Sequence, residues 1–256
     1  MFSEEINKVC NSAVAKSNLL KRSRARYFVA SMMAGVYVGF GILLIFVIGG
    51  TLNAANSPMT KILMGMSFGI ALSLVVMAGS ELFTGNNMIM TIGALEKRVS
   101  MKEVGGVWLY SYFGNLFGGI LISIAFVLSG LANKNIGDFI IKTASAKMTA
   151  DFTQLFFRGI LCNMLVCLAV WCSIKLKEET AKLIMIFWCL FAFITTGFEH
   201  SVANMTLLTT ALMLPGKLAA VTLGGYAYNL IVVTLGNIVG GALFIGVPYW
   251  FISREK

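Results

Sequence analysis

The residues best suited to chemistry lie in two interruptions of apolar stretches. Glu199 and His200, the single histidine of the chain, interrupt a long apolar run, and Glu81 follows another run upstream. In both places an asparagine lies five positions after the glutamate, at Asn86 and Asn204. Ionisable side chains are costly inside a membrane unless they face an interior pathway. The two interruptions therefore predict a functional site.

The composition indicates the environment of that site. The chain has 256 residues, of which 58% are hydrophobic and 12% charged, whereas soluble domains carry about 25% charged residues. We expect a multi-pass membrane protein in contact with lipid. The net charge of +9 does not indicate a nucleic-acid partner, because the basic residues lie beside apolar spans and form no separate basic face.

The apolar stretches predict six membrane-spanning helices. A membrane span needs about 20 apolar residues. The predicted spans lie at Tyr27–Gly50, Ile62–Ser80, Gly105–Gly130, Phe152–Ile174, Leu183–Phe198 and Val221–Ile252. The second and fifth continue, broken, beyond the interruptions. Residues 2–20 have the spacing of an amphipathic helix, which we expect at the inner membrane surface, with a subunit contact or a lid as alternatives.

An internal repeat relates the two halves. The pattern G-N-x-x-G-G occurs at Gly114–Gly119 and again at Gly236–Gly241, 122 positions later, and Glu199 lies 118 positions after Glu81. Similar offsets indicate a repeat of three spans. Since three is odd, the second copy must insert upside down, as in inverted-repeat transporters.

We therefore predict an all-α integral membrane fold of two inverted three-helix repeats. The chain is expected to form one transmembrane domain over residues 1–256, with the amphipathic helix and basic cluster at 1–26, the first repeat at 27–130 and the second at 131–256. Fourteen Lys and Arg residues fall on one set of connections and ends, and five on the other. The positive-inside rule then places both termini in the cytoplasm, and we expect the protein in the cell's inner (plasma) membrane.

The broken segments have a definite chemistry. Freed backbone groups inside a membrane are tolerated only where they are buried in protein or line a wet cavity, and the N-terminal end of a half-helix attracts anions. We expect Glu81 and Glu199 to accept hydrogen bonds from backbone donors of the opposite break and to hold its shape. His200 is the side chain whose ordinary titration range suits proton exchange near neutral pH.

Other motifs indicate no enzyme, metal or cofactor. Cys162, Cys167 and Cys172 recur every five residues, so their side chains diverge around a helix and are interpreted as packing residues. Gly65-Met66-Ser67-Phe68-Gly69 matches the G-x-S-x-G pattern of hydrolases, but it lies inside a predicted span without the strand-turn-helix context that the motif needs.

The broken segments and the fourth span together resemble the formate/nitrite transporter family and, within it, the hydrosulfide channel branch. The segments that carry the resemblance are Glu81-Leu82-Phe83-Thr84-Gly85-Asn86, Gly197-Phe198-Glu199-His200-Ser201-Val202-Ala203-Asn204-Met205 and Arg158-Gly159-Ile160-Leu161-Cys162-Asn163. The resemblance covers essentially the whole chain. It implies a homopentamer of aquaporin-like protomers, each with its own pore for small monovalent anions or their conjugate acids.

The resemblance also assigns roles to single residues. His200 corresponds to the central histidine of the pore, and Thr84 to a threonine that hydrogen-bonds near it. Lys147, expected in a loop before the fourth span, corresponds to a vestibule lysine that attracts anions, and Asn163 to a polar lining residue. The residues that correspond to hydrophobic constrictions are Phe68, Leu72, Leu82, Phe83, Val166 and Phe193.

The hypothesis that follows is a channel for hydrosulfide, formate or nitrite, with a preference for hydrosulfide. Lys147 and the half-helix ends would collect the anion, and a proton from His200, or one relayed past it, would let the solute cross the constrictions neutral. An alternating-access symporter of formate or nitrite with protons remains the alternative. An aquaporin would place Asn-Pro-Ala at both breaks, and an intramembrane protease would need G-x-S-G, whereas Glu81 follows Ser80.

Overall fold

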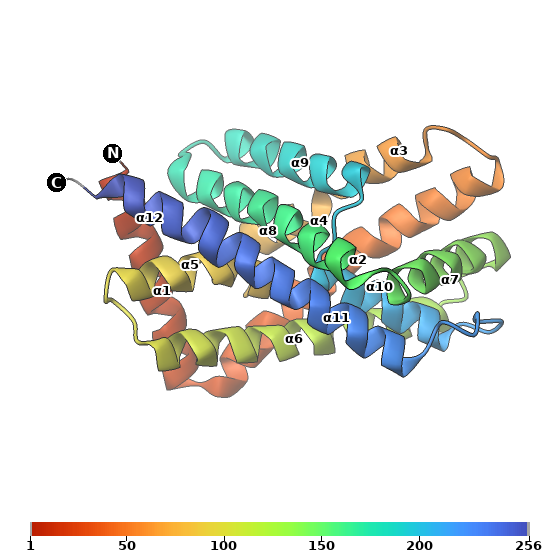
Figure 1. The fold of residues 1–256 in the computed structure, drawn as a ribbon, viewed down its shortest axis with the longest axis horizontal. Helices are drawn as coiled ribbons and strands as arrows, with labels where there is room; N and C mark the ends of the chain where they lie inside the picture. Colours follow the sequence, from red (N-terminus) through yellow and green to blue (C-terminus); the bar gives the residue numbers. More distant parts are fainter. Residues whose placement is uncertain (1, 255–256) are drawn as a thin grey trace.

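The computed structural model describes residues 2–254, so Met1, Glu255 and Lys256 at the ends of the predicted domain lie outside it. The described chain is all-helical. Its helices are α1 (Ser3–Arg22), α2 (Arg24–Ala54), α3 (Thr60–Ser67), α4 (Ile70–Met77), α5 (Phe83–Leu95), α6 (Met101–Leu128), α7 (Lys134–Met148), α8 (Phe152–Lys175), α9 (Glu179–Thr196), α10 (Ser201–Met213), α11 (Leu223–Ile238), the π-helix η1 (Val239–Gly246) and α12 (Val247–Ser253) (Figure 1).

The six predicted spans are confirmed. Within residues 2–254, six helical segments are long and apolar enough to cross a membrane: α2, α3 with α4, α6, α8, α9, and α11 continued through η1 and α12. Their apolar composition leaves large side chains such as Phe113 and Trp188 exposed on the surface. In a membrane protein those side chains face lipid or a neighbouring subunit.

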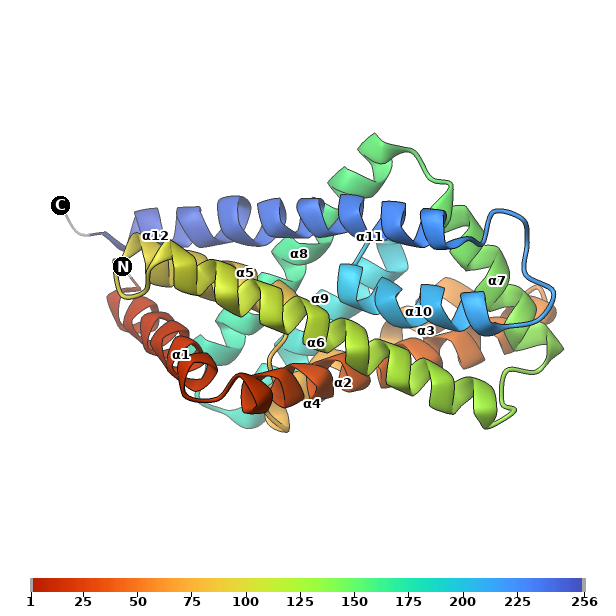
Figure 2. The ribbon, with the colours of Figure 1, turned by 90° about the horizontal axis from the view of Figure 1, so that it is seen from below.

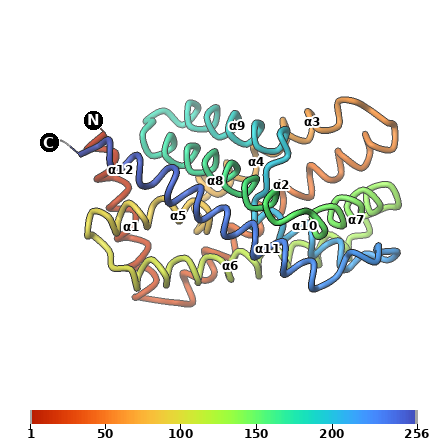
Figure 3. Tube along the Cα trace, viewed as in Figure 1, coloured from red at the N-terminus to blue at the C-terminus, as the bar shows by residue number. Residues whose placement is uncertain are grey.

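The second and fifth spans are broken, as expected. The chain leaves the helical path after α4 and resumes it at α5, and it does the same between α9 and α10 (Figure 3). Gly79 (φ 78°) and Gly197 (φ 81°) lie just after the helices that end there. Glycine adopts this left-handed conformation without steric cost, which is why each helix can stop at these positions.

Close contacts between small residues hold the spans together. Gly118 of α6 lies so near the backbone of α2 that a Cβ atom there would collide with the carbonyl of Met32. Gly35 of α2 is in the same relation to the backbone of Asn115. Such approaches let two helices pack backbone to backbone where no hydrophobic effect drives association.

Two amphipathic helices cover opposite ends of the molecule, α1 beside the described chain ends and α7 at the far end (Figures 1 and 2). The buried face of α1 packs against α5, α6 and α8 through Ile6, Val9 and Ala13. The prediction of a loop at Lys147 is wrong, because this residue lies in the last turn of α7. Apolar residues at helical spacing, Ile136, Ile140, Ile141, Ala144 and Met148, are buried and make that segment a helix.

Candidate functional site

The carboxylate of Glu199 is held by side chains of its own half. Lys147 donates from Nζ to Oε1 at 2.7 Å, and Asn204 donates from Nδ2 to Oε2 at 2.6 Å. Asn229 fixes both donors, because its Oδ1 accepts from Asn204 at 2.8 Å and its Nδ2 donates to the backbone carbonyl of Lys147 at 3.0 Å. The side chain of Glu199 is 4% exposed, so this network replaces the hydration that the carboxylate loses on burial.

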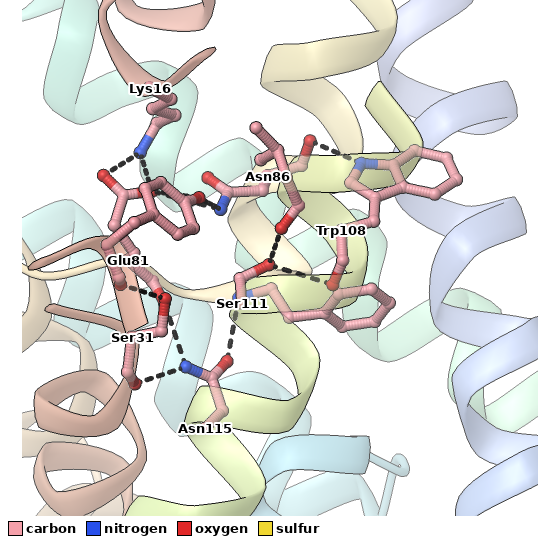
Figure 4. A network of polar contacts seen from close by, with 10 residues as sticks. Lys16, Ser31, Glu81, Asn86, Trp108, Ser111 and Asn115 are labelled. Carbon is pink, nitrogen blue, oxygen red and sulfur yellow. Dashed lines mark hydrogen bonds and ion pairs between the residues drawn. The ribbon is translucent and has the colours of Figure 1, made fainter. Parts of the chain in front are cut away.

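Glu81 has a matching environment at the other end of the site. Lys16 of α1 donates to both carboxylate oxygens, at 2.9 and 2.8 Å, and Tyr27 and Asn86 donate to Oε2 at 2.9 and 3.2 Å. Figure 4 shows Lys16 and Asn86 converging on Glu81. Sequence reasoning missed Lys16 and Tyr27, because neither lies in a motif that indicates its partner.

The expectation that backbone donors of the opposite break hold the two carboxylates is wrong. Among the described residues, their hydrogen-bond donors are the side chains named above. The physical reason is charge. An ammonium group satisfies a buried carboxylate better than a neutral amide does, since charge-assisted hydrogen bonds are about twice as strong.

The backbone of each break is satisfied by a buried asparagine. Asn115 accepts from the amide of Phe83 at 2.9 Å and donates to the carbonyls of Ser31 (2.7 Å) and Glu81 (2.9 Å). Asn237 likewise accepts from the amide of Ser201 at 2.9 Å.

The two donor contacts of Asn237 complete the match. Its Nδ2 donates to the carbonyls of Gly159 (2.8 Å) and Glu199 (3.0 Å). Asn115 and Asn237 are the asparagines of the repeated G-N-x-x-G-G pattern, so the pattern marks the residues that hold the breaks open. Sequence reasoning found the repeat but not this role.

The two breaks meet at His200. This residue is the N-cap of α10, and its Nδ1 accepts a hydrogen bond from the amide of Ala203 at 3.1 Å. Its Nε2 lies 3.0 Å from the hydroxyl of Thr84, in the first turn of α5. The ring stacks on Phe193 with 5.9 Å between centroids and is 5% exposed. The structure thus brings the predicted pair Thr84 and His200 together over 116 positions of sequence.

Asn163 lies behind this pair. Its Nδ2 is within hydrogen-bond distance of the carbonyls of Asn237 (2.7 Å) and Thr84 (3.2 Å) and of Oδ1 of Asn87 (3.0 Å). Gly241 makes room for it, since a Cβ there would lie 2.5 Å from that nitrogen. Asn163 therefore connects α8 to α5 of the first broken segment and to α11, and it sets the position of Thr84.

Apolar side chains surround the ring of His200. A central cavity of about 10 Å³, which is room for about one water molecule, is lined by Val38, Phe68, Ala71, Leu72, Leu82, Val166, Leu190, Phe193 and His200. Five of the six predicted constriction residues thus converge there. The sixth, Phe83, does not line this cavity, and its ring packs edge-on against Tyr112 with 5.1 Å between centroids.

Two larger cavities adjoin the centre. The α7-side cavity, of about 280 Å³, is lined by residues that include Lys61, Lys147 and His200. The α1-side cavity, of about 470 Å³, is lined by residues that include Lys16, Glu81 and Leu82. The central cavity shares His200 and Phe193 with the first and Leu82 with the second. Each larger cavity has a lysine paired with a glutamate at its wall.

The fold and the site define a multi-pass membrane protein with a narrow apolar passage between two wider cavities. Residues 3–251 match the family model described as formate/nitrite transporter. The chain belongs to the formate/nitrite transporter family, a family of membrane channels and transporters. The resemblance stated from the sequence is thereby confirmed.

Curated relatives align with nearly the whole chain. The nitrite transporter NirC of Salmonella typhimurium (strain LT2) is 44% identical over 258 residues, which cover 100% of this chain and 94% of the relative. The formate channel FocA of Escherichia coli (strain K12) is 32% identical over 250 residues, with 90% and 87% covered.

Two solved structures share the fold of this chain. A structure titled "FNT family ion channel" aligns with a TM-score of 0.93 at 41% identity and covers 99% of this chain and 100% of that one. A pentameric formate channel with formate bound aligns with a TM-score of 0.81 at 30% identity and covers 92% and 99%.

Proposed function

We propose that the protein is a channel for small monovalent anions, which cross its narrowest part as their neutral conjugate acids. The observation that carries this proposal is the central cavity, where Phe68, Leu72, Leu82, Val166 and Phe193 surround the single imidazole. A charge in such an apolar environment costs several kcal/mol. Formic acid, nitrous acid and hydrogen sulfide are small and uncharged, so they avoid that cost.

The wider cavities supply the charge that concentrates anions. Lys147 on the α7 side and Lys16 on the α1 side each face a cavity while they are paired with a glutamate. Lys61 lines the α7-side cavity as well. A cavity with apolar walls focuses the field of such groups and raises the local anion concentration. A proton supplied in the wider cavities, one of which reaches His200, then neutralises the solute before it enters the constriction.

Nitrite is the first solute to test, because the relatives at 44% and 42% identity are named nitrite transporters. Formate is the second, in view of the formate channel at 32% identity. The preference for hydrosulfide rests on the sequence resemblance of the fourth and fifth spans. No contact in the described site selects one of these anions by its chemistry.

The experiment is flux into liposomes, with nitrite, formate and hydrosulfide compared at equal concentration and pH. Uptake of at least one of them well above that of empty liposomes is the expected result, and no uptake of any would overturn the proposal. The turnover number of each protomer separates a channel from an alternating-access symporter, because a neutral solute carries no electric current. Stopped-flow flux at known protein content is expected to give a turnover far above that of a carrier.

We also propose a homopentamer with both termini in the cytoplasm and two inverted repeats. The pentameric formate channel, the described chain ends at one end of the molecule (Figure 1), and the matched contacts of Asn115 and Asn237 support these points. Native mass spectrometry tests the oligomer. Labelling of single cysteines introduced near residues 2 and 254 tests the topology, because a membrane-impermeant reagent must fail to reach them in intact cells.

A further inference from the structure

The wall of the α7-side cavity changes from charged to apolar along α3. Lys61 is exposed at the start of this helix, and Met64, one turn later, lines the same cavity. Phe68, just after the last residue of α3, lines the central cavity. Residues at positions i, i+3 and i+7 of a helix share one face. This face of α3 therefore leads from solvent at Lys61 to the apolar passage at Phe68.

Below Lys61 the α7-side cavity is aromatic. Phe46 of α2 and Phe139 of α7 line it with 5.6 Å between their ring centroids and 44° between the ring planes. Gly49 makes room for this wall, since a Cβ atom there would lie 2.5 Å from Cε1 of Phe139 and 2.7 Å from Sδ of Met64. Phe198 lines the cavity as well. Aromatic rings and a thioether sulfur are the neighbours that a further aromatic ring prefers.

The mouth of this cavity carries a positive charge without a counter-ion. Two lysines, Lys61 and Lys147, line the cavity, and no Asp or Glu of the described chain lines it. Lys147 is paired with Glu199, whereas Lys61 takes part in none of the ion pairs within residues 2–254. Because Lys61 is exposed, an anion can pair with it while part of that anion stays in contact with water.

The α1-side cavity lacks this combination of groups. None of the described residues that line it is aromatic, and both carboxylate oxygens of Glu81 at its wall accept from Lys16. The central cavity differs again, because its volume of about 10 Å³ leaves room for about one water molecule. A six-membered ring that enters the α7-side cavity therefore cannot pass beyond it.

We propose that the α7-side cavity binds small aromatic monocarboxylates, which block the passage instead of crossing it. The ring lies among Phe46, Phe139 and Phe198, and the carboxylate stays at the wet mouth beside Lys61. The cavity volume of about 280 Å³ is near the lower end of small-molecule sites, which begin at about 300 Å³. Binding does not depend on the proposed function, but the block does, because a ligand in this cavity covers the way to the central cavity.

Fluorine NMR of 4-fluorobenzoate, titrated with the full-length protein in detergent micelles, measures the binding. We expect saturable binding with a Kd on the order of 1 mM, because one ring is buried and one exposed ion pair forms. Two further probes separate these contributions: 4-fluorobenzyl alcohol has the ring without the charge, and trifluoroacetate has the charge without the ring. Both should bind several-fold more weakly. If the alcohol binds as tightly as the carboxylate, the ring dissolves in micelle or protein without help from Lys61, and the proposal is overturned.

Matched variants locate the site. Lys61→Ala should weaken the binding of 4-fluorobenzoate about two- to fivefold, as expected for the loss of an exposed ion pair. Phe139→Leu keeps an apolar side chain but removes the ring, and should weaken binding about fivefold. The controls are Lys142→Ala and Phe113→Leu, which change an exposed lysine and an exposed phenylalanine that do not line the cavity. If a control weakens binding as much as its partner variant, the ligand binds elsewhere.

Flux into liposomes tests the block. The external probe is 4-fluorobenzenesulfonate, which stays charged and so does not cross lipid as a neutral acid. It should inhibit the protomers whose α7 side faces outward, and Lys61→Ala should need about two- to fivefold more of it for the same inhibition. Flux that is unchanged when the NMR titration shows the site to be occupied would overturn the block. If the natural protein transports none of the three anions, the proposed function fails, while the NMR titration still decides whether the site exists.

Discussion

The Nζ atom of Lys147 lies 2.7 Å from Oε1 of Glu199, and the carboxylate side chain of this pair is 4% exposed. The pair joins the end of α7 to the break before α10. The lysine that the resemblance assigns to anion attraction is therefore also the counter-ion of a buried carboxylate. A second pair, Lys16 with Glu81, joins α1 to the other break.

The first prediction concerns the Lys147–Glu199 pair. Lys147→Met leaves Glu199 charged and buried, so we expect a loss of about 3–5 kcal/mol of stability and a lower temperature of thermal unfolding in detergent. Lys147→Met combined with Glu199→Gln removes both charges and should recover most of that loss, because Asn204 can still donate to the new amide oxygen. If the double variant unfolds at the same temperature as the single variant or below it, the pair does not control stability.

The second prediction concerns Asn237. Asn237→Ala leaves the amide of Ser201 and two carbonyls without their partner, at a cost of about 1–3 kcal/mol for each group. We expect the variant to unfold well below the natural protein and to lose flux. Asn133→Ala is the control, since it removes a cap at the exposed start of α7 and should cost only about 1 kcal/mol. Equal effects of the two changes would contradict the role of Asn237 in holding the break.

The third prediction separates two phenylalanines that the resemblance places together. Phe193 lines the central cavity and packs edge-on against Phe68, whereas Phe83 packs against Tyr112. Phe193→Ala opens the apolar passage to water, so nitrite flux at pH 8, where the solute is almost entirely anionic, should rise by about tenfold, equivalent to 1.4 kcal/mol of barrier.

Phe83→Ala also removes a phenylalanine ring, but from a position that does not line the central cavity, and it serves as the control. Its ratio of flux at pH 8 to flux at pH 5 should match that of the natural protein. Size-exclusion profiles of both variants show whether they remain folded. If Phe83→Ala raises the nitrite flux at pH 8 more than Phe193→Ala does, the constriction lies at Phe83 and not at Phe193.

The fourth prediction concerns the attachment of α1. Glu103, in the first turn of α6, accepts from the hydroxyl of Ser17 at 2.6 Å and pairs with Lys21 at 2.5 Å. On the buried face of α1, burial raises the pKa of the Cys10 thiol, and the charge of Glu96 adds to the rise. Cys10 is 1% exposed, so it should react slowly with a maleimide reagent in the natural protein.

Glu103→Ala should loosen α1 and speed the labelling of Cys10 several-fold, because reaction needs the helix to open. The half-buried Cys172 of α8 serves as an internal reference, and its labelling rate should not change. Unchanged labelling of Cys10 would mean that the apolar face of α1, rather than Glu103, holds the helix. The measurement is mass spectrometry of peptides after timed labelling.

Much of the fold follows from local properties of the sequence. The six spans, the two breaks and the G-N-x-x-G-G repeat depend on hydropathy and on the cost of a charge inside an apolar run, and both act over a few neighbouring residues. The segment at Lys147 was the exception. Its helix depends on a buried face formed by Ile136, Ile140 and Met148, and the polar residues between them conceal that face in the sequence.

The site depended on contacts between distant residues. Lys16 reaches Glu81 over 65 positions, and Asn237 reaches the amide of Ser201 over 36. A sequence places charges near apolar runs, but it does not show which donor a buried carboxylate selects or which nitrogen of His200 faces an amide. Only the tertiary structure decides this, because hydrogen bonds need donor and acceptor within about 3 Å and correctly oriented, and packing of separate helices sets that geometry.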